Sequence, residues 1–372
     1  MPITIQPYAT DRIAAVKAFN KRLRDRGEAL FKLPESPVSD WLPAGEGETL
    51  FEDFSLANDG DFVRGGYVLK HQPYWVNGEA ATTGYVYSPL SEGIVNPAFG
   101  KVGLQLMMHA LRRQPLLYCL GMGGFENLLP KMLKAMGWSL CAVSFFLRVV
   151  RPAAFFRNLT YASTYKGGRF VAQVLAASGL GWLGVKCVNT LRTGSPPRAD
   201  ELSWQLVPEF GDEVNPIWEA ARANCSLVAV RDRASLARLY PRRVEKFLRI
   251  LVTRAGKPVG WAVALDTPMH GHKFFGEARL GSVIDCFALP GAEFDVFHAA
   301  TRVLEERAVE VIVTNQSHEA WRAACVRAGY LGGPSNFIFA TSPKLTARIT
   351  PFEQHQPRFH LTRGDGEGPT HL

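Results

Sequence analysis

A turn of nine residues combines the features of an anion-binding site. Residues 95–103 read Val-Asn-Pro-Ala-Phe-Gly-Lys-Val-Gly and separate a predicted strand over 84–95 from a predicted helix that begins near Lys101. The start of a helix presents unpaired N–H groups and the positive end of the helix dipole, and it therefore attracts anions. Gly100 and Gly103 permit close approach of a ligand to the backbone, and Lys101 adds a positive charge. The turn predicts a site for an anion such as a pyrophosphate.

The elements around this turn form an α/β unit. The strand over 84–95 is followed by a helix with an apolar stripe, by a second strand over 115–120 and by a second helix that ends at Gly137-Trp138. A helix between two strands carries the chain back across the sheet, so the strands are expected to be parallel neighbours. Ligands of such units gather beyond the carboxyl ends of the strands, which is where residues 95–103 lie.

This unit resembles the acetyl-CoA-binding core of the GNAT acyltransferase superfamily. The resemblance rests on Val95, Pro97, Gly103 and the closing pair Gly137-Trp138. The family carries Arg/Gln-x-x-Gly-x-Gly/Ala at the turn; here Gly100, Gly103 and Gln105 stand at the three motif positions, and only the middle one matches. The resemblance implies that acetyl-CoA or another acyl-CoA is the acyl donor. The residues that it implies for donor binding are Val95, Gly100, Lys101, Val102, Gly103 and Gln105.

The resemblance also implies where catalytic groups would lie. In GNAT enzymes a carboxylate on or beside the core strand often removes a proton from the attacking amine. Glu92 is the first candidate, and Asp285 occupies a similar strand in the second half of the chain. The alternatives are a solvated loop acid for Glu92 and a structural ion pair for Asp285, because an unpaired buried charge is costly. Arg64, on the strand before the core strand, is predicted to grip an anionic acceptor.

The same order of elements recurs after Pro197. The recurring elements are strands over 202–208, 281–289 and 309–314, a hairpin over 248–265, helices over 212–223, 294–307 and 318–328, the pair Gly329-Tyr330, and a closing strand over 336–341. Such self-similarity indicates a duplication. The predicted fold class is α/β, with two GNAT-like mixed-sheet domains in tandem. The second copy is expected to be degenerate, because its turn, Pro-Gly-Ala-Glu over 290–293, places an acid at the helix start.

Composition shifts give the predicted boundaries. The expected parts are a GNAT-like domain with the donor site over 1–152, a helical connector over 153–198, a second GNAT-like domain over 199–345 and a C-terminal tail over 346–372. A glycine-rich tail of alternating charge is expected to fray. The alternative is that residues 359–361 dock and that Arg363, Asp365 and Glu367 fold over a cleft.

Bulk properties limit the function classes. The net charge of +8 over 372 residues favours acidic partners, which include nucleotide cofactors, acyl carrier proteins, RNA and anionic lipid surfaces. The six cysteines are far apart and fit the reduced core of a cytoplasmic protein. No spacing of His or Cys predicts a metal site. No apolar stretch is long enough for a membrane span, although peripheral membrane contact through residues 155–191 stays open.

Three functions fit these features. The first is acyl transfer from acyl-CoA, or from an acyl carrier protein, to an amine or hydroxyl of a small molecule or sugar. The second is aminoacyl transfer from a charged tRNA, because the tandem layout resembles the Fem-type transferases and residues 231–249 are rich in Arg. A solvated helix face is the simpler interpretation of that run, so nucleic acid is not the expected partner. The third is a non-catalytic CoA- or effector-binding protein, favoured by the imperfect turn and by a helix over 132–135 without the family's tyrosine.

Overall fold

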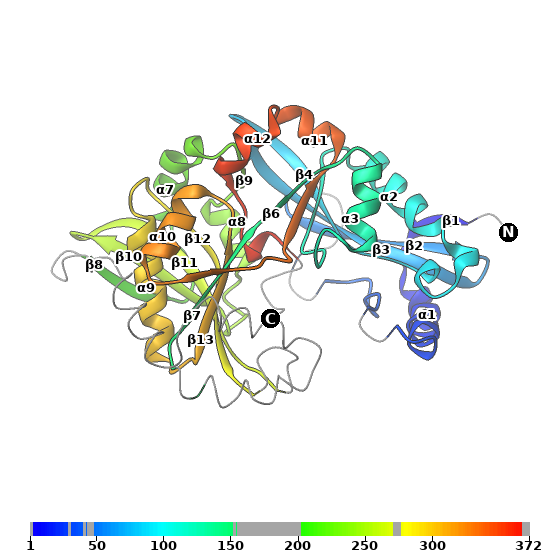
Figure 1. The fold of residues 1–372 in the computed structure, drawn as a ribbon, viewed down its shortest axis with the longest axis horizontal. Coiled ribbons are helices and arrows are strands. Elements are labelled where there is room, and N and C mark those ends of the chain that lie inside the picture. Colours follow the sequence, from blue (N-terminus) through cyan, green and yellow to red (C-terminus); the bar gives the residue numbers. More distant parts are fainter. Residues whose placement is uncertain are drawn as a thin grey trace. The chain divides into compact units, whose positions relative to one another are not determined.

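The computed structural model describes residues 3–28, 31–39, 42, 48–151, 154, 202–270 and 277–366. They form two compact units, of which the first is Met1–Cys141 with Ile338–Thr350 and the second is Ala142–Phe337 with Pro351–Leu372. Each unit contains a mixed β-sheet with helices packed on it (Figure 1). The connector predicted over 153–198 lies outside the described residues, apart from residue 154.

The sheet of the first unit has the strand order β1-β2-β3-β4-β5-β15-β6. Its strands are β1 (Thr4–Pro7), β2 (Phe51–Asp59), β3 (Phe62–Val76), β4 (Glu79–Ser91), β5 (Leu117–Leu120), β6 (Ser139–Ala142) and β15 (Ile338–Thr341). Its helices are α1 (Ile13–Asp25), α2 (Val102–Arg113), α3 (Leu128–Ala135) and α11 (Pro343–Arg348). The hairpin of β3 and β4 turns at Asn77-Gly78, a sequence typical of such turns, and both turn residues have positive φ.

Strand β4 changes partner along its length. It pairs in parallel with β5 only as far as Tyr85. Further along, the register between β3 and β4 shifts between Gly66 and Val68, so that Ser88 and Pro89 of β4 oppose one residue of β3. Ser88 has a φ of 48°, as the first residue of a bulge can. Within the part of the chain that the structure describes, the end of β4 therefore has no parallel neighbour, directly before the predicted anion-binding turn.

The second unit has a seven-stranded sheet in the order β14-β7-β13-β12-β11-β10-β8. The strands of this sheet are β7 (Ser144–Val149), β8 (Leu202–Val207), β10 (Leu248–Arg254), β11 (Lys257–Pro268), β12 (Arg279–Ala288), β13 (Val311–Gln316) and β14 (Leu331–Gly333). Two short strands of the unit, β9 (Leu227–Ala229) and β16 (Phe359–His360), pair with each other outside this sheet. Its helices are α7 (Val214–Ala221), α8 (Arg233–Leu239), α9 (Glu293–Glu306), α10 (Glu319–Arg327) and α12 (Phe352–His355). The predicted hairpin at residues 255–257 joins β10 to β11.

The two units repeat the same local features, which confirms the tandem α/β fold. Strands β12 and β13 pair in parallel as far as Val283, and the register between β11 and β12 then shifts, as it does between β3 and β4. Helices α3 and α10 end alike, because Gly137 and Gly329 both have a φ of 80°. The N–H groups of the next residues, Trp138 and Tyr330, each bond a carbonyl five residues back. Such glycine caps end helices through a left-handed residue.

Each unit takes one strand from the other half of the chain. β7 pairs with β13 and β14 in the second sheet, although it follows the helices of the first half. β15 pairs with β5 in the first sheet. The prediction that residues 336–341 close the second copy is therefore wrong. An apolar strand pattern predicts burial but does not specify which sheet edge the strand joins.

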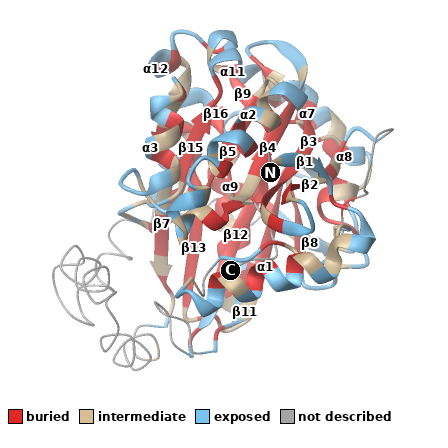
Figure 2. Cartoon of the chain, turned by 90° about the vertical axis from the view of Figure 1, so that its right-hand side faces the viewer, coloured by how far each residue is buried: buried red, intermediate tan, exposed pale blue. Residues whose placement is uncertain are grey.

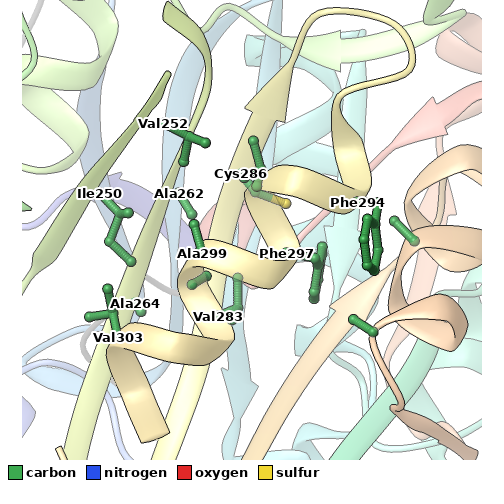
Figure 3. Packing of buried hydrophobic residues seen from close by; sticks show 14 of the residues in the cluster. Ile250, Val252, Ala262, Ala264, Val283, Cys286, Phe294, Phe297, Ala299 and Val303 are labelled. Atoms are coloured by element: carbon green, nitrogen blue, oxygen red, sulfur yellow. The ribbon is translucent and has the colours of Figure 1, made fainter. Parts of the chain in front are cut away.

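The core of the second unit lies between α9 and the central strands. Figure 3 shows Ala299 and Val303 of α9 beside Val283 and Ala264 of the sheet, and all four are buried. Figure 2 colours each residue by its burial: the strands are buried, and the outer faces of the helices are exposed. The stripe of small and branched residues on α9 is what permits this close packing.

The residues expected to fray at the C-terminus are folded as far as Gly366. After α12, a short 3₁₀ helix over Gln356–Arg358 leads into β16, which pairs in parallel with β9. A second 3₁₀ helix covers Arg363–Asp365 and has a capping box, in which Thr362 and Asp365 bond each other's backbone N–H groups. Phe359 and Leu361 are fully buried. The segment Phe359–Gly366, called the C-terminal segment below, is therefore part of the second unit.

Candidate functional site

The predicted anion-binding turn leads directly into α2. Lys101 is the N-cap residue, and it makes no side-chain capping bond. The first turn of α2 contains no acidic residue. Before it, a 3₁₀ helix over Pro97–Phe99 is capped by Asn96, whose Oδ1 accepts a hydrogen bond from the N–H of Ala98 at 3.2 Å. The structure thus brings the predicted donor-binding residues from Gly100 to Gln105 together at one helix start.

The close backbone approach in this turn occurs at a glycine that the sequence analysis did not single out. A Cβ atom at Gly93 would lie 2.7 Å from the carbonyl oxygen of Phe99 and 2.9 Å from the Cα of Gly100, too close for any side chain. A Cβ at Gly103 would lie 3.6 Å from Ser91 Oγ, an ordinary contact. Gly93 therefore sets the shape of the turn, whereas Gly103 leaves space at the helix start.

Glu92 follows β4 and is held by three arginines. It is 1% exposed, and its carboxylate lies 3.0 Å from Arg64 Nη1, 3.2 Å from Arg22 Nη2 and 3.6 Å from Arg26 Nη1. Arg64 also pairs with Asp59 at 3.3 Å. The structure thus joins the proposed base to the proposed acceptor-binding residue in one ion-pair cluster, which ties α1 to β3 and β4. The catalytic role of Glu92 and the acceptor-binding role of Arg64 stay predictions.

This cluster adds positive charge beside the turn. Its three arginines and two acids leave a net charge of +1, and Lys101 adds another. The guanidinium of Arg64 lies 4.2 Å from the centre of the Phe99 ring, within cation–π distance. Because Phe99 belongs to the turn, the cluster borders the helix start of α2. Charge and helix dipole therefore act together to favour an anion.

The equivalent helix start in the second unit already carries negative charge. Glu293 and Asp295 lie in the first turn of α9. The Glu293 carboxylate accepts a hydrogen bond from the N–H of Gly291 at 2.9 Å, and Asp295 pairs with Arg254. A carboxylate of the chain itself thus bonds the turn that a phosphate would need. The acid predicted at this helix start is therefore present, and the degeneracy of the second copy stays a prediction.

The C-terminal segment lies against the end of β12 and the residues after β13. His360 Nε2 donates a hydrogen bond to the carbonyl oxygen of Cys286 at 2.9 Å. The N–H of Leu361 bonds Ser317 Oγ at 2.8 Å, and the Ser317 N–H bonds the Leu361 carbonyl at 3.3 Å. These contacts begin beyond the point where β12 and β13 stop pairing. In the second unit, the position equivalent to the free end of β4 is therefore occupied by the chain itself.

Asp285 belongs to a fully buried charge cluster that anchors this segment. Arg231, Asp285 and Asp365 are all 0% exposed. Arg231 lies 2.8 Å from Asp285 Oδ2 and 2.7 Å from Asp365 Oδ1. Asp285 also accepts hydrogen bonds from Tyr240 Oη at 2.6 Å and from Thr362 Oγ1 at 3.1 Å. Burial raises the pKa of Asp285, and the Arg231 guanidinium opposes that rise. Asp285 therefore forms the structural ion pair that was the alternative to a catalytic role. The catalytic role of Asp285 stays a prediction.

The Arg-rich run over 231–249 does not form one continuous basic surface. Arg231 is buried in the charge cluster, and Arg249 is buried against the backbone carbonyls of Tyr240, Pro241 and Val244. Arg233 pairs with Asp212. The two ends of the run therefore have structural partners.

Acid should weaken the attachment of the C-terminal segment through His360. Burial lowers the pKa of His360 to about 3, from an ordinary value of 6.5. The unfolded chain takes up a proton near pH 6.5, and the folded chain does not until near pH 3. The contribution of neutral His360 to the free energy of unfolding is therefore fully present above pH 6.5, and it is lost as pH falls toward 3. Between pH 6.5 and 4.5 we expect a loss of about 2–3 kcal/mol of unfolding free energy from this residue.

Denaturant unfolding at pH 7 and pH 4.5 checks this expectation. His360→Gln keeps an N–H donor for Cys286 but does not titrate, so it should lose less stability on acidification than the wild-type chain does. The contributions of the other titrating groups cancel in the comparison. An equal pH dependence in the two proteins would rule out His360 as the titrating group.

The described residues contain neither a cluster suited to a metal ion nor a helix suited to span a membrane. Among the described residues, no group of three or more His, Cys, Asp or Glu side chains is arranged to hold a metal ion. No helix in the part of the chain that the structure covers is both long enough and apolar enough to cross a bilayer.

The chain is similar to known proteins in structure but not detectably in sequence. No protein-family model and no curated sequence matches the chain. A GCN5-related N-acetyltransferase from Anabaena variabilis ATCC 29413 is 10% identical, with a TM-score of 0.51, over 91% of this chain and 72% of that chain. A protein of Enterococcus faecalis V583 described as a probable N-acyltransferase is 8% identical, with a TM-score of 0.52, over 94% of this chain and 74% of its own.

Saccharomyces cerevisiae N-myristoyltransferase, in a structure with bound myristoyl-CoA, is also similar. It is 10% identical, with a TM-score of 0.53, over 92% of this chain and 79% of that chain. Each of these matches covers more than nine tenths of the chain and so includes residues of both units. At this identity the matches show the fold alone, which this chain shares with the GCN5-related N-acetyltransferase and the N-myristoyltransferase.

Proposed function

We propose that this chain is an acyltransferase that moves an acyl group from acyl-CoA to an amine or hydroxyl of a small molecule or sugar. The observation that carries the proposal is the contrast between the two helix starts. The start of α2 has no acid, no side-chain cap and a positive cluster beside it. The start of α9 has two acids, one of which bonds the turn. The donor is therefore assigned to the first unit.

The acyl-CoA donor would form hydrogen bonds mainly with backbone groups, and fewer with side chains. The N–H groups of the first turn of α2 would bind the CoA phosphates, with Lys101 and the arginine cluster adding positive charge. Among the described residues, β4 pairs in parallel with β5 no further than Tyr85, and its later backbone would bond the amides of pantetheine. Acetyl-CoA fits this arrangement, and so do longer acyl-CoA species. The similar N-myristoyltransferase holds myristoyl-CoA in its structure, which supports an acyl-CoA donor.

A cytoplasmic location is part of the proposal. The cysteines that the structure describes are all free and buried, which suits a reducing compartment. A donor bound to an acyl carrier protein stays an alternative to free acyl-CoA, because both present the same phosphopantetheine arm.

Thermal unfolding with and without ligand tests the proposal. The ligands are acetyl-CoA, a long-chain acyl-CoA and free CoA. A ligand present at a hundred times its dissociation constant should stabilise the folded chain by about 2.7 kcal/mol, which raises the unfolding midpoint by several degrees. The absence of a shift with every CoA species would overturn the free acyl-CoA reading.

A turnover assay distinguishes an acyltransferase from the remaining alternative, a non-catalytic CoA-binding protein. If acyl-CoA binds and a panel of sugar amines and amino acids yields no acylated product, a non-catalytic CoA-binding protein becomes the better account. The tRNA-dependent alternative predicts RNA binding that weakens steeply with salt. Among the described residues no contact specifically favours it, and two of the arginines on which it relies are buried.

A further inference from the structure

We propose that Tyr87 is a catalytic residue of the first unit and that Glu52 is the positioning residue that receives its proton. The inference rests on the proposed acyl-transfer function. Tyr87 Oη donates a hydrogen bond to Glu52 Oε1 at 2.9 Å. Glu52 is 4% exposed, whereas Tyr87 is half-buried. A buried carboxylate therefore lies behind a more accessible phenol.

The two residues lie on the sheet face that points away from α2. Side chains alternate along a strand, so Leu69 of β3 and Val86 of β4, which pack in the core with α2, mark the opposite face. Glu52 on β2 stands opposite Lys70 on β3, and Lys70 stands opposite Tyr85 on β4. Tyr87 is two residues beyond Tyr85 and so shares its face. The acid and the phenol come from different strands of one rigid sheet.

Tyr87 stands where β4 becomes free. β4 pairs with β5 at Tyr85 and no further, and the bulge begins at Ser88. A thioester whose pantetheine bonds the free end of β4 would place its carbonyl carbon beside this bulge. On the face away from α2, residues of α1 pack with Leu56 and Leu90, and Tyr87 stays partly exposed there. An acceptor would approach at this exposed phenol, which makes Tyr87 the titratable side chain that we assign to the reaction.

The polar face around Tyr87 is also lined by aromatic rings. Tyr85 stacks on Tyr87 with ring centres 5.3 Å apart, and it stacks on Tyr118 at 5.1 Å. Lys70 Nζ lies 5.2 Å from the centre of the Tyr85 ring and is 2% exposed. Stacked rings restrict the orientation of the Tyr87 phenol. The Glu52 contact then fixes where its oxygen accepts a proton.

Glu52 is better placed than Glu92 to accept a proton during the reaction. The Glu92 carboxylate is paired with three guanidinium groups, so a proton would have to displace ion pairs. Glu52 accepts a hydrogen bond from the neutral hydroxyl of Tyr87. Transfer of that proton requires only a shift along an existing hydrogen bond of ordinary length. Glu52 is therefore placed to receive a proton through Tyr87.

The acceptor nitrogen or oxygen attacks the thioester carbonyl, and its proton passes to Tyr87 Oη while the Tyr87 proton passes to Glu52. The new bond between the acceptor and the acyl carbon forms, the carbon–sulfur bond breaks, and the CoA thiolate takes a proton from water. Glu52 then returns its proton to solvent. The products are the acylated acceptor and free CoA.

Chloroacetyl-CoA tests this assignment without knowledge of the acceptor. A nucleophile beside the acyl group attacks its CH₂ carbon, chloride leaves, and the modified residue is found by peptide mass spectrometry. We expect the adduct on Tyr87 and none at this position in Tyr87→Phe. Glu52→Gln should slow the labelling about 100-fold, the usual size of a proton-transfer contribution. Glu52→Asp should restore part of the rate, and the pH dependence of labelling should change with it.

Tyr85→Phe is the matched control. Tyr85 lies on the same strand and face, but its hydroxyl donates to the carbonyl oxygen of Leu120 at 3.2 Å. Its labelling should match that of the wild-type chain. Protection by acetyl-CoA and a thermal shift with acetyl-CoA show whether the donor binds. If the donor binds and the adduct forms elsewhere or not at all, the role of Tyr87 is overturned while the proposed function stands. If the donor does not bind, both fall.

Discussion

Replacing Asp365 with alanine is expected to destabilise the second unit by about 3–5 kcal/mol. The substitution removes one partner of Arg231, which has no exposed surface, and leaves its charge buried with fewer acceptors. Breaking a buried ion pair from one side costs this much because the remaining charge has lost its hydration without compensation. The same substitution removes the bond from Asp365 to the N–H of Thr362. The C-terminal segment should lose its attachment together with the charge pair.

Equilibrium unfolding in urea measures this loss, and an exposed ion pair supplies the control. Asp212 pairs with Arg233 at 2.9 Å on the surface of the same unit, where both side chains are at least half exposed. Asp212→Ala should change the unfolding free energy far less than Asp365→Ala, because surface pairs contribute little. Protease digestion followed by mass spectrometry should show new cleavage after Arg363 in Asp365→Ala alone. Equal small losses in both variants would mean that the C-terminal segment does not depend on the charge cluster.

The sequence predicted the features that depend on short-range signals. Asn77-Gly78 specifies a hairpin because both residues tolerate positive φ, and the structure has the turn there. The apolar stripe after Lys101 predicts a helix, and α2 begins at Val102. Gly137 and Gly329, each followed by an aromatic residue, indicated two equivalent helix ends. Each of these signals lies within a few residues of the element that it specifies.

The features that the sequence did not predict join distant parts of the chain. Arg231 and Asp365 are 134 positions apart, and the run of arginines around Arg231 suggested a surface, not a buried cluster. β15 carries the pattern of a buried strand, which fits either sheet equally well. The pair of Tyr87 and Glu52 gave no signal, because each residue occupies an ordinary position in an alternating strand. In such cases the partner is chosen by tertiary packing, which leaves no local pattern.

The two units share a fold but differ at the helix start and at the strand end that are equivalent in both. In the first, the helix start and the end of the bulged strand β4 stay available to a ligand. In the second, Glu293 bonds the equivalent turn and the C-terminal segment covers the equivalent strand end. If the first unit binds the donor as proposed, the duplicated fold retains one donor site, and the other copy holds the end of the chain in place. This division predicts that one chain binds one acyl-CoA.

The most direct test is a calorimetric titration of acetyl-CoA into the wild-type chain, Gly103→Glu and Met108→Glu. Both variants add one negative charge to α2, but Met108 is exposed about 7.5 Å further along the helix. A Cβ at Gly103 meets Ser91 at an ordinary distance, so Gly103→Glu should fold with an unchanged unfolding midpoint. We expect one site per chain in the wild type and in Met108→Glu, and at least about 100-fold weaker binding in Gly103→Glu, because its carboxylate would repel the phosphates. Binding that survives in Gly103→Glu would contradict a donor site at the start of α2.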